Sequence, residues 1–166
     1  MQKQLFVYLI ISYALFGNQS FATSLTPGSQ CVRWNSSDVV PALEFSEIHN
    51  KSATQWMRVD CPIERTDFFD VLHWPALESV SITVADQNFS NDIICRAWRF
   101  KRTPAGALDT FTGGFSASDG TSARPQILNL GSVGLPSNED HAFIECHVPP
   151  TFAGRSSSII NYRVDQ

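Results

Sequence analysis

Apolar residues recur at every second position in several separate segments of this 166-residue chain. In residues 79–85, Val80, Ile82 and Val84 share one side of an extended backbone, while serine and threonine occupy the other side. Side chains of a β-strand alternate between the two faces of its sheet, so this period predicts strands. No segment carries a convincing stripe of helical period, and the chain is therefore expected to be all-β.

Turn-forming residues separate the expected strands, among them residues 86–88 and the pair Gly113-Gly114. The segments expected as strands are residues 30–34, 43–48, 54–61, 79–85, 92–101, 108–112, 126–130, 141–148 and 160–164. Short strands without crossover helices favour an antiparallel β-sandwich, of jelly-roll or immunoglobulin-like type, over a parallel sheet. We expect a single β-sandwich domain over residues 31–166, preceded by a short segment over residues 23–30.

The N-terminus resembles a secretory signal peptide. Lys3 precedes an uncharged apolar run over residues 5–16, and Ser20-Phe21-Ala22 places small residues at −3 and −1 of a cleavage site. The alternative is an uncleaved anchor, but the run is shorter than the roughly 20 residues of a spanning helix, and no second such run follows. We therefore expect residues 1–22 to be removed, leaving a secreted or periplasmic protein without a transmembrane anchor.

Four cysteines, Cys31, Cys61, Cys95 and Cys146, lie beyond this segment. An even number of cysteines in an exported chain predicts two disulfides, which we expect to lock stacked sheets together. Three pairings are possible, and we favour Cys31–Cys61 with Cys95–Cys146 because the second pair lies on two strongly patterned segments. Zinc is disfavoured because no two cysteines are close in sequence.

The two halves of the chain also resemble a known set of proteins. The segment Val59-Asp60-Cys61-Pro62-Ile63 and the later segment Glu145-Cys146-His147-Val148-Pro149-Pro150 carry the resemblance. They are similar to small exported bacterial proteins with four cysteines, a C-P-[IV] step and a late C-x-[LV]-P-P step. The resemblance implies an exported bacterial domain and supplies no catalytic residue.

Charge and motifs exclude several classes of function. The chain has a formal net charge of −4, whereas nucleic-acid-binding domains usually carry a basic excess. The sequence contains no G-x-S-x-G, H-E-x-x-H, P-loop or G-x-G-x-x-G. We therefore expect no nucleic-acid partner, no cofactor and no catalytic residue.

A stripe of aromatic and basic side chains is the best candidate for a binding site. If Cys95 points into the core, Ile93 and Ala97 point the same way, and the residues between them share the outer face. The outer residues are then Ile94, Arg96, Trp98, Phe100 and Arg102, and the same argument from Cys61 adds Trp56 and Arg58. Exposed aromatic rings beside arginines can stack on sugars. Alternatively, the stripe only stabilises a sheet face, or the faces are inverted and Trp98 lies in the core.

Two further groups could hold a metal, but neither is favoured. His141, Glu145 and His147 share one strand face, where their spacing makes three ligands diverge. Residues 86–92 are rich in oxygen ligands but lack the spacing of a helix–loop–helix calcium loop. The sequence thus predicts a non-enzymatic module that binds a carbohydrate or an envelope or extracellular protein, with a small polysaccharide hydrolase as the alternative.

Overall fold

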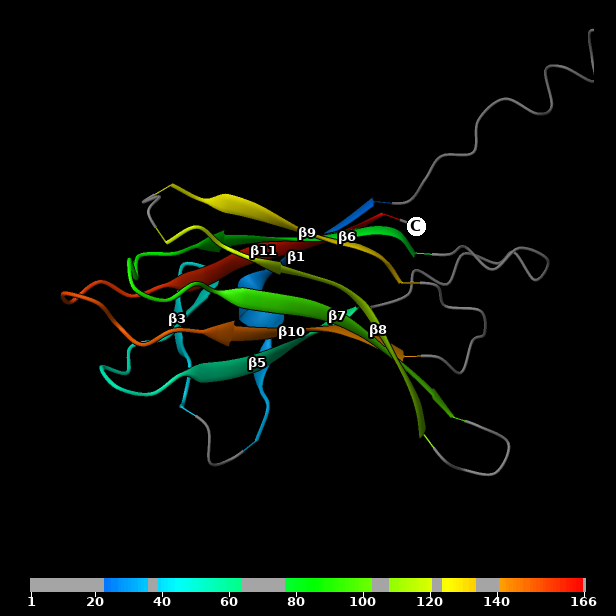
Figure 1. Cartoon of the computed structure of the whole chain (residues 1–166), viewed down its shortest axis with the longest axis horizontal. Coiled ribbons are helices and arrows are strands. Elements are labelled where there is room, and N and C mark those ends of the chain that lie inside the picture. The colour runs from blue at the N-terminus through cyan, green and yellow to red at the C-terminus, as the bar shows by residue number, and fades with distance from the viewer. Residues whose placement is uncertain are drawn as a thin grey trace, which may run out of the picture.

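Two antiparallel sheets lie face to face in the computed structural model of the chain (Figure 1). The structure describes residues 23–35, 39–63, 77–102, 108–120, 124–133 and 141–165, so the expected signal peptide over residues 1–22 lies outside them. The elements are β1 (Thr23–Pro27), a short 3-10 turn η1 (Gly28–Gln30), β2 (Val32–Arg33), β3 (Ala42–Glu44), β4 (Glu47–His49), β5 (Met57–Ile63), β6 (Leu77–Ala85), β7 (Ile94–Arg102), β8 (Leu108–Ala117), β9 (Gln126–Val133), β10 (His141–Val148) and β11 (Ser158–Asp165).

Strands that are consecutive in the sequence often lie in different sheets, so the chain passes several times from one sheet to the other. The first sheet has the order β3-β4-β11-β6-β9, with β1 also paired to β11, and the second has the order β2-β5-β10-β7-β8. Figure 1 shows them as two layers, with η1 linking β1 of one layer to β2 of the other. This architecture confirms the predicted all-β sandwich. The segment over residues 23–30, set apart in the sequence interpretation, supplies β1 and η1 to it.

Apolar side chains from the inner faces of both sheets meet in one core. On β6, Val80, Ile82 and Val84 are at most 1% exposed, as their alternation predicted. On the second sheet, Cys95 and Ala97 are fully buried. Removal of this apolar surface from water is the main force that holds the layers together. No helix of the described residues is long and apolar enough to cross a bilayer.

Both expected disulfides are present, Cys31–Cys61 and Cys95–Cys146. Cys95 and Cys146 are direct partners in the register of β7 and β10, so their bridge lies within the second sheet. Cys31–Cys61 attaches the segment that follows η1 to β5 of that same sheet. The expectation that the bridges lock the two layers together is therefore wrong for Cys95–Cys146, because that bridge joins neighbouring strands.

The glycine pair Gly113-Gly114, expected as a turn, instead lies inside β8. A Cβ atom added to Gly114 would lie 2.5 Å from the carbonyl oxygen of Leu130 in β9. Only glycine permits this approach of the β8 backbone to the other sheet. The pair therefore marks close backbone packing, and the expected strand over residues 108–112 continues to Ala117.

Near the C-terminus, the register shifts between Ile159 and Asn161. Such an irregularity changes which residues point inward. Ile159 is consequently fully buried and Ile160 is only half-buried, whereas regular alternation with Tyr162 and Val164 would place Ile160 on the same face as those two residues. Tyr162 and Val164 are buried as expected.

The segment over residues 43–48, expected as one strand, is a hairpin of β3 and β4. Its tip is formed by Phe45 and Ser46, which have positive φ angles of 52° and 76°. The phenyl ring of Phe45 is 99% exposed, so no packing compensates for this backbone conformation. Two-residue hairpin turns with two positive φ angles favour Asn-Gly, because other side chains are strained there.

Replacing Phe45 by Asn and Ser46 by Gly is therefore expected to raise the free energy of unfolding by about 1–2 kcal/mol. Urea unfolding followed by circular dichroism measures the change. As a control, Leu43→Asn removes an exposed apolar side chain from β3 while leaving the turn unchanged, and should not stabilise the protein. An unchanged or lower stability of the Asn-Gly variant would contradict the assignment of strain to this turn.

Candidate functional site

The outer face of the second sheet gathers aromatic and charged side chains from all five of its strands or their ends. The register places Trp98 of β7 opposite Phe143 of β10, and Arg96 opposite Glu145. On the other side of β7, Phe115 of β8 is the partner of Arg96. We call this surface the aromatic face and define it by Trp34, Arg58, Arg96, Trp98, Phe100, Phe115, Phe143 and Glu145.

Three rings stack in a row on the aromatic face. The ring of Phe143 lies nearly parallel to those of Trp98 and Phe100, with centroid distances of 6.5 and 5.2 Å. All three side chains are half-buried, so each ring packs against its neighbours and also meets solvent. Aromatic pairs at these distances stabilise a sheet surface and present a continuous apolar platform.

Arginines flank the rings at two places. The guanidinium carbon of Arg58 lies 3.9 Å from the ring centroid of Trp34, within the range of a cation–π interaction. That of Arg96 lies 5.6 Å from the centroid of Trp98 and 6.0 Å from that of Phe115. The rings with the most free surface are Phe115, which is 60% exposed, and Trp34, which is 44% exposed.

A nearly buried carboxylate lies between these groups. The Oε1 atom of Glu145 is 2.7 Å from Nε of Arg58 and 2.8 Å from Nε2 of His147. Burial of a charged group costs free energy unless a partner of opposite charge compensates it, and Arg58 supplies that partner here. The pair fixes the Arg58 guanidinium over the Trp34 ring.

The predicted site residues fall on this face with two qualifications. Arg58, Arg96, Trp98 and Phe100 lie on the outer side, opposite the inward-facing Cys95 and Cys61, as the alternation required. Trp56 is 43% exposed just before β5 begins. The side chain of Arg102 lies outside the described residues.

Three aromatic residues of the site were missed in the sequence. Phe143 alternates with the buried Ile144 and Ala142, so the same face argument could have found it. Phe115 was hidden because the glycine pair before it suggested a turn. Trp34 directly follows a two-residue strand, which is too short to show a period.

The side chains that the sequence analysis considered as metal ligands on this strand contact other protein groups instead. His141, Glu145 and His147 share the outer face, but Glu145 is paired with Arg58 and His141 lies opposite Phe100. No group of three or more metal-binding side chains occurs among the residues that the structure describes.

In the loop over residues 86–92, the first carboxylate is turned inward. Asp86 is fully buried. It accepts hydrogen bonds from the hydroxyl groups of Ser118 and Ser157 and from the backbone N–H groups of Asn88 and Ile93. The loop thus uses this carboxylate to organise its own backbone.

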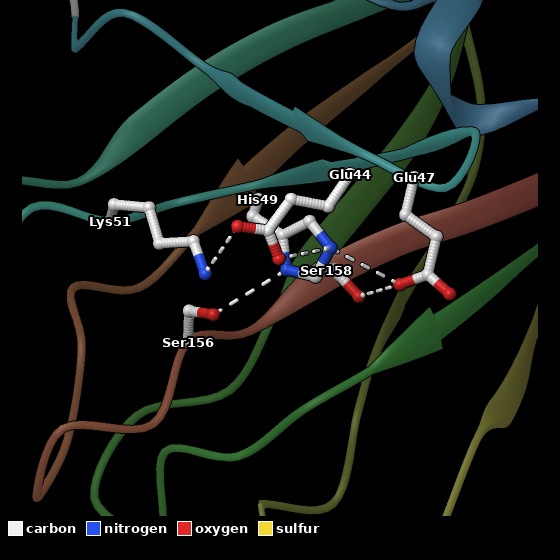
Figure 2. Close-up of polar contacts among 6 residues, drawn as sticks. All are labelled: Glu44, Glu47, His49, Lys51, Ser156 and Ser158. Carbon is white, nitrogen blue, oxygen red and sulfur yellow. Dashed lines mark hydrogen bonds and ion pairs between the residues drawn. The ribbon is translucent and has the colours of Figure 1, made fainter.

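A second polar cluster lies on the first sheet, and the sequence analysis did not anticipate it. Figure 2 shows its members: Glu44, Glu47, His49, Lys51, Ser156 and Ser158. The imidazole of His49 lies between the Ser156 hydroxyl, 3.4 Å from Nδ1, and the Glu47 carboxylate, 3.4 Å from Nε2. A neutral imidazole protonated on Nε2 could accept the Ser156 proton at Nδ1, which is the relation of a nucleophile to a general base.

The remaining contacts tie the β3–β4 hairpin to β11. The hydroxyl group of Ser158 donates a hydrogen bond of 2.8 Å to Glu47. Lys51 Nζ lies 3.0 Å from Glu44, and their hydrogen bond lowers the pKa of that carboxyl group. These carboxylates are therefore already occupied by protein groups in the cluster.

No protein-family model and no curated protein matches this chain. Among solved structures, it is similar to a family two carbohydrate esterase from Cellvibrio japonicus, with a TM-score of 0.45 and 9% identity over 87% of this chain. The chain spans about a third (34%) of that esterase.

Two carbohydrate-binding modules are also similar. One is CBM36, solved in complex with calcium and xylotriose, with a TM-score of 0.43, 9% identity, and coverage of 86% of this chain and 99% of the module. The other is the CBM36-1 domain of a multidomain xylanase from the hindgut metagenome of Trinervitermes trinervoides, with a TM-score of 0.39, 10% identity, and coverage of 87% and 97%.

Proposed function

We propose that this chain is a non-enzymatic, exported binding protein that takes a saccharide on the aromatic face. The observation that carries the proposal is the exposure of Phe115 and Trp34 beside arginines on one sheet surface. Stabilisation of the sheet accounts for the half-buried stack of Trp98, Phe100 and Phe143. It does not account for the surface of Phe115 and Trp34 that remains in water, 60% and 44% of each side chain, since exposed apolar surface of this kind marks binding sites.

The mixture of groups on the aromatic face favours a saccharide over a protein partner. Interfaces between proteins are enriched in aromatic residues and arginine but depleted in glutamate, whereas here Glu145 lies among the rings beside Arg58. A sugar ring presents C–H groups to an aromatic face and hydroxyl groups to its surroundings. Rings interspersed with hydrogen-bonding groups match that alternation.

The proposal of export rests on two observations and on one proposed resemblance. The N-terminus has the pattern of a signal peptide, the four cysteines form two disulfides, and the cysteine-containing segments resemble those of exported bacterial proteins. Disulfides persist mainly in oxidising compartments such as the periplasm or the extracellular space. We therefore place the binding function outside the cytoplasm.

The test is a screen of the protein lacking residues 1–22 against immobilised glycans, followed by calorimetric titration of the best ligand. The double variant Phe115→Ala/Trp34→Ala is expected to weaken binding by about tenfold or more. Its melting temperature should change little, since Phe115 is 60% exposed and Trp34 is 44% exposed. Trp98→Ala should instead lower both affinity and stability, because its ring is half-buried and stacked on Phe143.

Phe45→Ala is the matched control, because it removes a fully exposed ring from a hairpin of the first sheet. It should leave glycan binding unchanged. Binding that survives in the double variant, or a protein that retains no glycan at all, would refute the proposed function.

The hydrolase remains the second candidate, favoured by the contacts of Ser156 with His49 and of His49 with Glu47. The same screen distinguishes the two functions. Turnover of a glycan that is lost in Ser156→Ala would support the hydrolase, whereas retention without turnover supports the binding protein.

A further inference from the structure

We infer that the saccharide is acidic and that Arg96 binds its carboxylate. This inference rests on the proposed function and specifies its ligand class. It starts from the charges of the aromatic face, where the two arginines have different surroundings. Arg58 is neutralised by Glu145 at 2.7 Å, whereas no ion pair joins Arg96 to a carboxylate among the residues that the structure describes.

Register explains why Arg96 has no such partner. The two cross-strand neighbours of Arg96 are Glu145 and Phe115. Glu145 is turned to the other side, where a single oxygen, Oε1, contacts both Arg58 and His147. Phe115 offers a ring and no charge. Arg96 is consequently exposed and positively charged. The carboxylate nearest to it in the register, that of Glu145, is already paired with Arg58 and His147.

The aromatic rings around Arg96 restrict the orientation of its guanidinium group. The guanidinium carbon lies 5.6 Å from the centroid of Trp98 and 6.0 Å from that of Phe115. Cation–π attraction on two sides holds the group over the sheet and leaves its N–H donors available to a ligand. A planar fork of donors of this kind pairs preferentially with a carboxylate or another oxyanion.

One sugar residue can use both features at once. A uronic acid carries its carboxylate directly on the pyranose ring, so a ring stacked on Phe115 can direct its carboxylate to the neighbouring Arg96. A neutral sugar would stack on the same ring but would leave the charge of Arg96 without a partner. Because the net charge of the chain is −4, long-range attraction does not favour a polyanion, and the preference must come from this short-range contact.

The experiment compares polygalacturonate with its fully methyl-esterified form, because the two share a backbone and differ only in free carboxylates. A sulfated polysaccharide is the third probe and distinguishes recognition of a carboxylate from recognition of any oxyanion. Wild-type protein is expected to bind polygalacturonate about tenfold or more tightly than the esterified form, as one charge-assisted pair provides.

Arg96→Gln should abolish that difference while retaining the weaker binding to the esterified polymer. Arg163→Gln, which removes the same charge from β11 of the first sheet, is the matched control and should retain the full preference. Equal wild-type affinity for the two polymers, loss of the preference in both variants, or tighter binding of the sulfated probe would overturn the inference while leaving saccharide binding intact. Failure to bind any glycan would instead refute the proposed function itself.

Discussion

Replacing Cys95 and Cys146 together by alanine is expected to lower the free energy of unfolding by about 4 kcal/mol. The bridge joins two residues that are 51 apart in the sequence. In the chain-entropy model it stabilises the protein by lowering the conformational entropy of this loop in the unfolded state. Both cysteines are fully buried, so their loss also leaves poorly packed space in the core. A change of this size is a large part of the stability of a typical single domain.

Urea unfolding of the non-reduced proteins measures this effect. The Cys31→Ala/Cys61→Ala variant opens a shorter loop, with a separation of 30 residues, and should lose about 0.5 kcal/mol less from loop closure. A loss below about 1 kcal/mol for the Cys95–Cys146 pair would show that neighbouring strand pairing already restricts the unfolded chain.

Replacing Asp86 by alanine is expected to cost about 3 kcal/mol or more of stability. Its carboxylate is fully buried and accepts hydrogen bonds from the hydroxyl groups of Ser118 and Ser157, which lie 32 and 71 residues from it along the chain. The backbone N–H of Asn88 also donates to it, at 2.9 Å. Alanine would leave these donors buried without an acceptor, and each such group carries a desolvation penalty.

The matched control is Asp92→Ala in the same loop. Asp92 is exposed and, within the part of the chain that the structure describes, accepts a hydrogen bond only from the backbone N–H of Gly120, so its loss should cost less than about 1 kcal/mol. Thermal unfolding of both variants at one pH provides the comparison. Equal small effects for Asp86 and Asp92 would contradict the assignment of Asp86 as the organising group of this loop.

Part of the candidate site could be predicted from the sequence, because the alternation of side chains along a strand shows which residues share its outer face. Cys95 is buried because a disulfide cysteine belongs in the core, and alternation then places Arg96 and Trp98 outside. The same reasoning failed for Phe115, because the glycine pair before it has the composition of a turn. Glycine serves there to let two backbones approach, a requirement that local sequence does not express.

Local sequence determined what depends on neighbouring residues: the strand period, the inward and outward faces of the regular strands such as β6 and β7, and the all-β class. The favoured cysteine pairing also held, since Cys95 and Cys146 are on strongly patterned strands that turn out to be neighbours. Only the tertiary structure decided what depends on distant segments. The hydrogen bonds of Asp86, the position of His49 beside Ser156, and the engagement of Glu145 by Arg58 join residues far apart in the chain. Their positions depend on which strands pair and in which register. The two-residue period of a strand is the same whichever strand it pairs with, so the sequence pattern does not indicate the pairing.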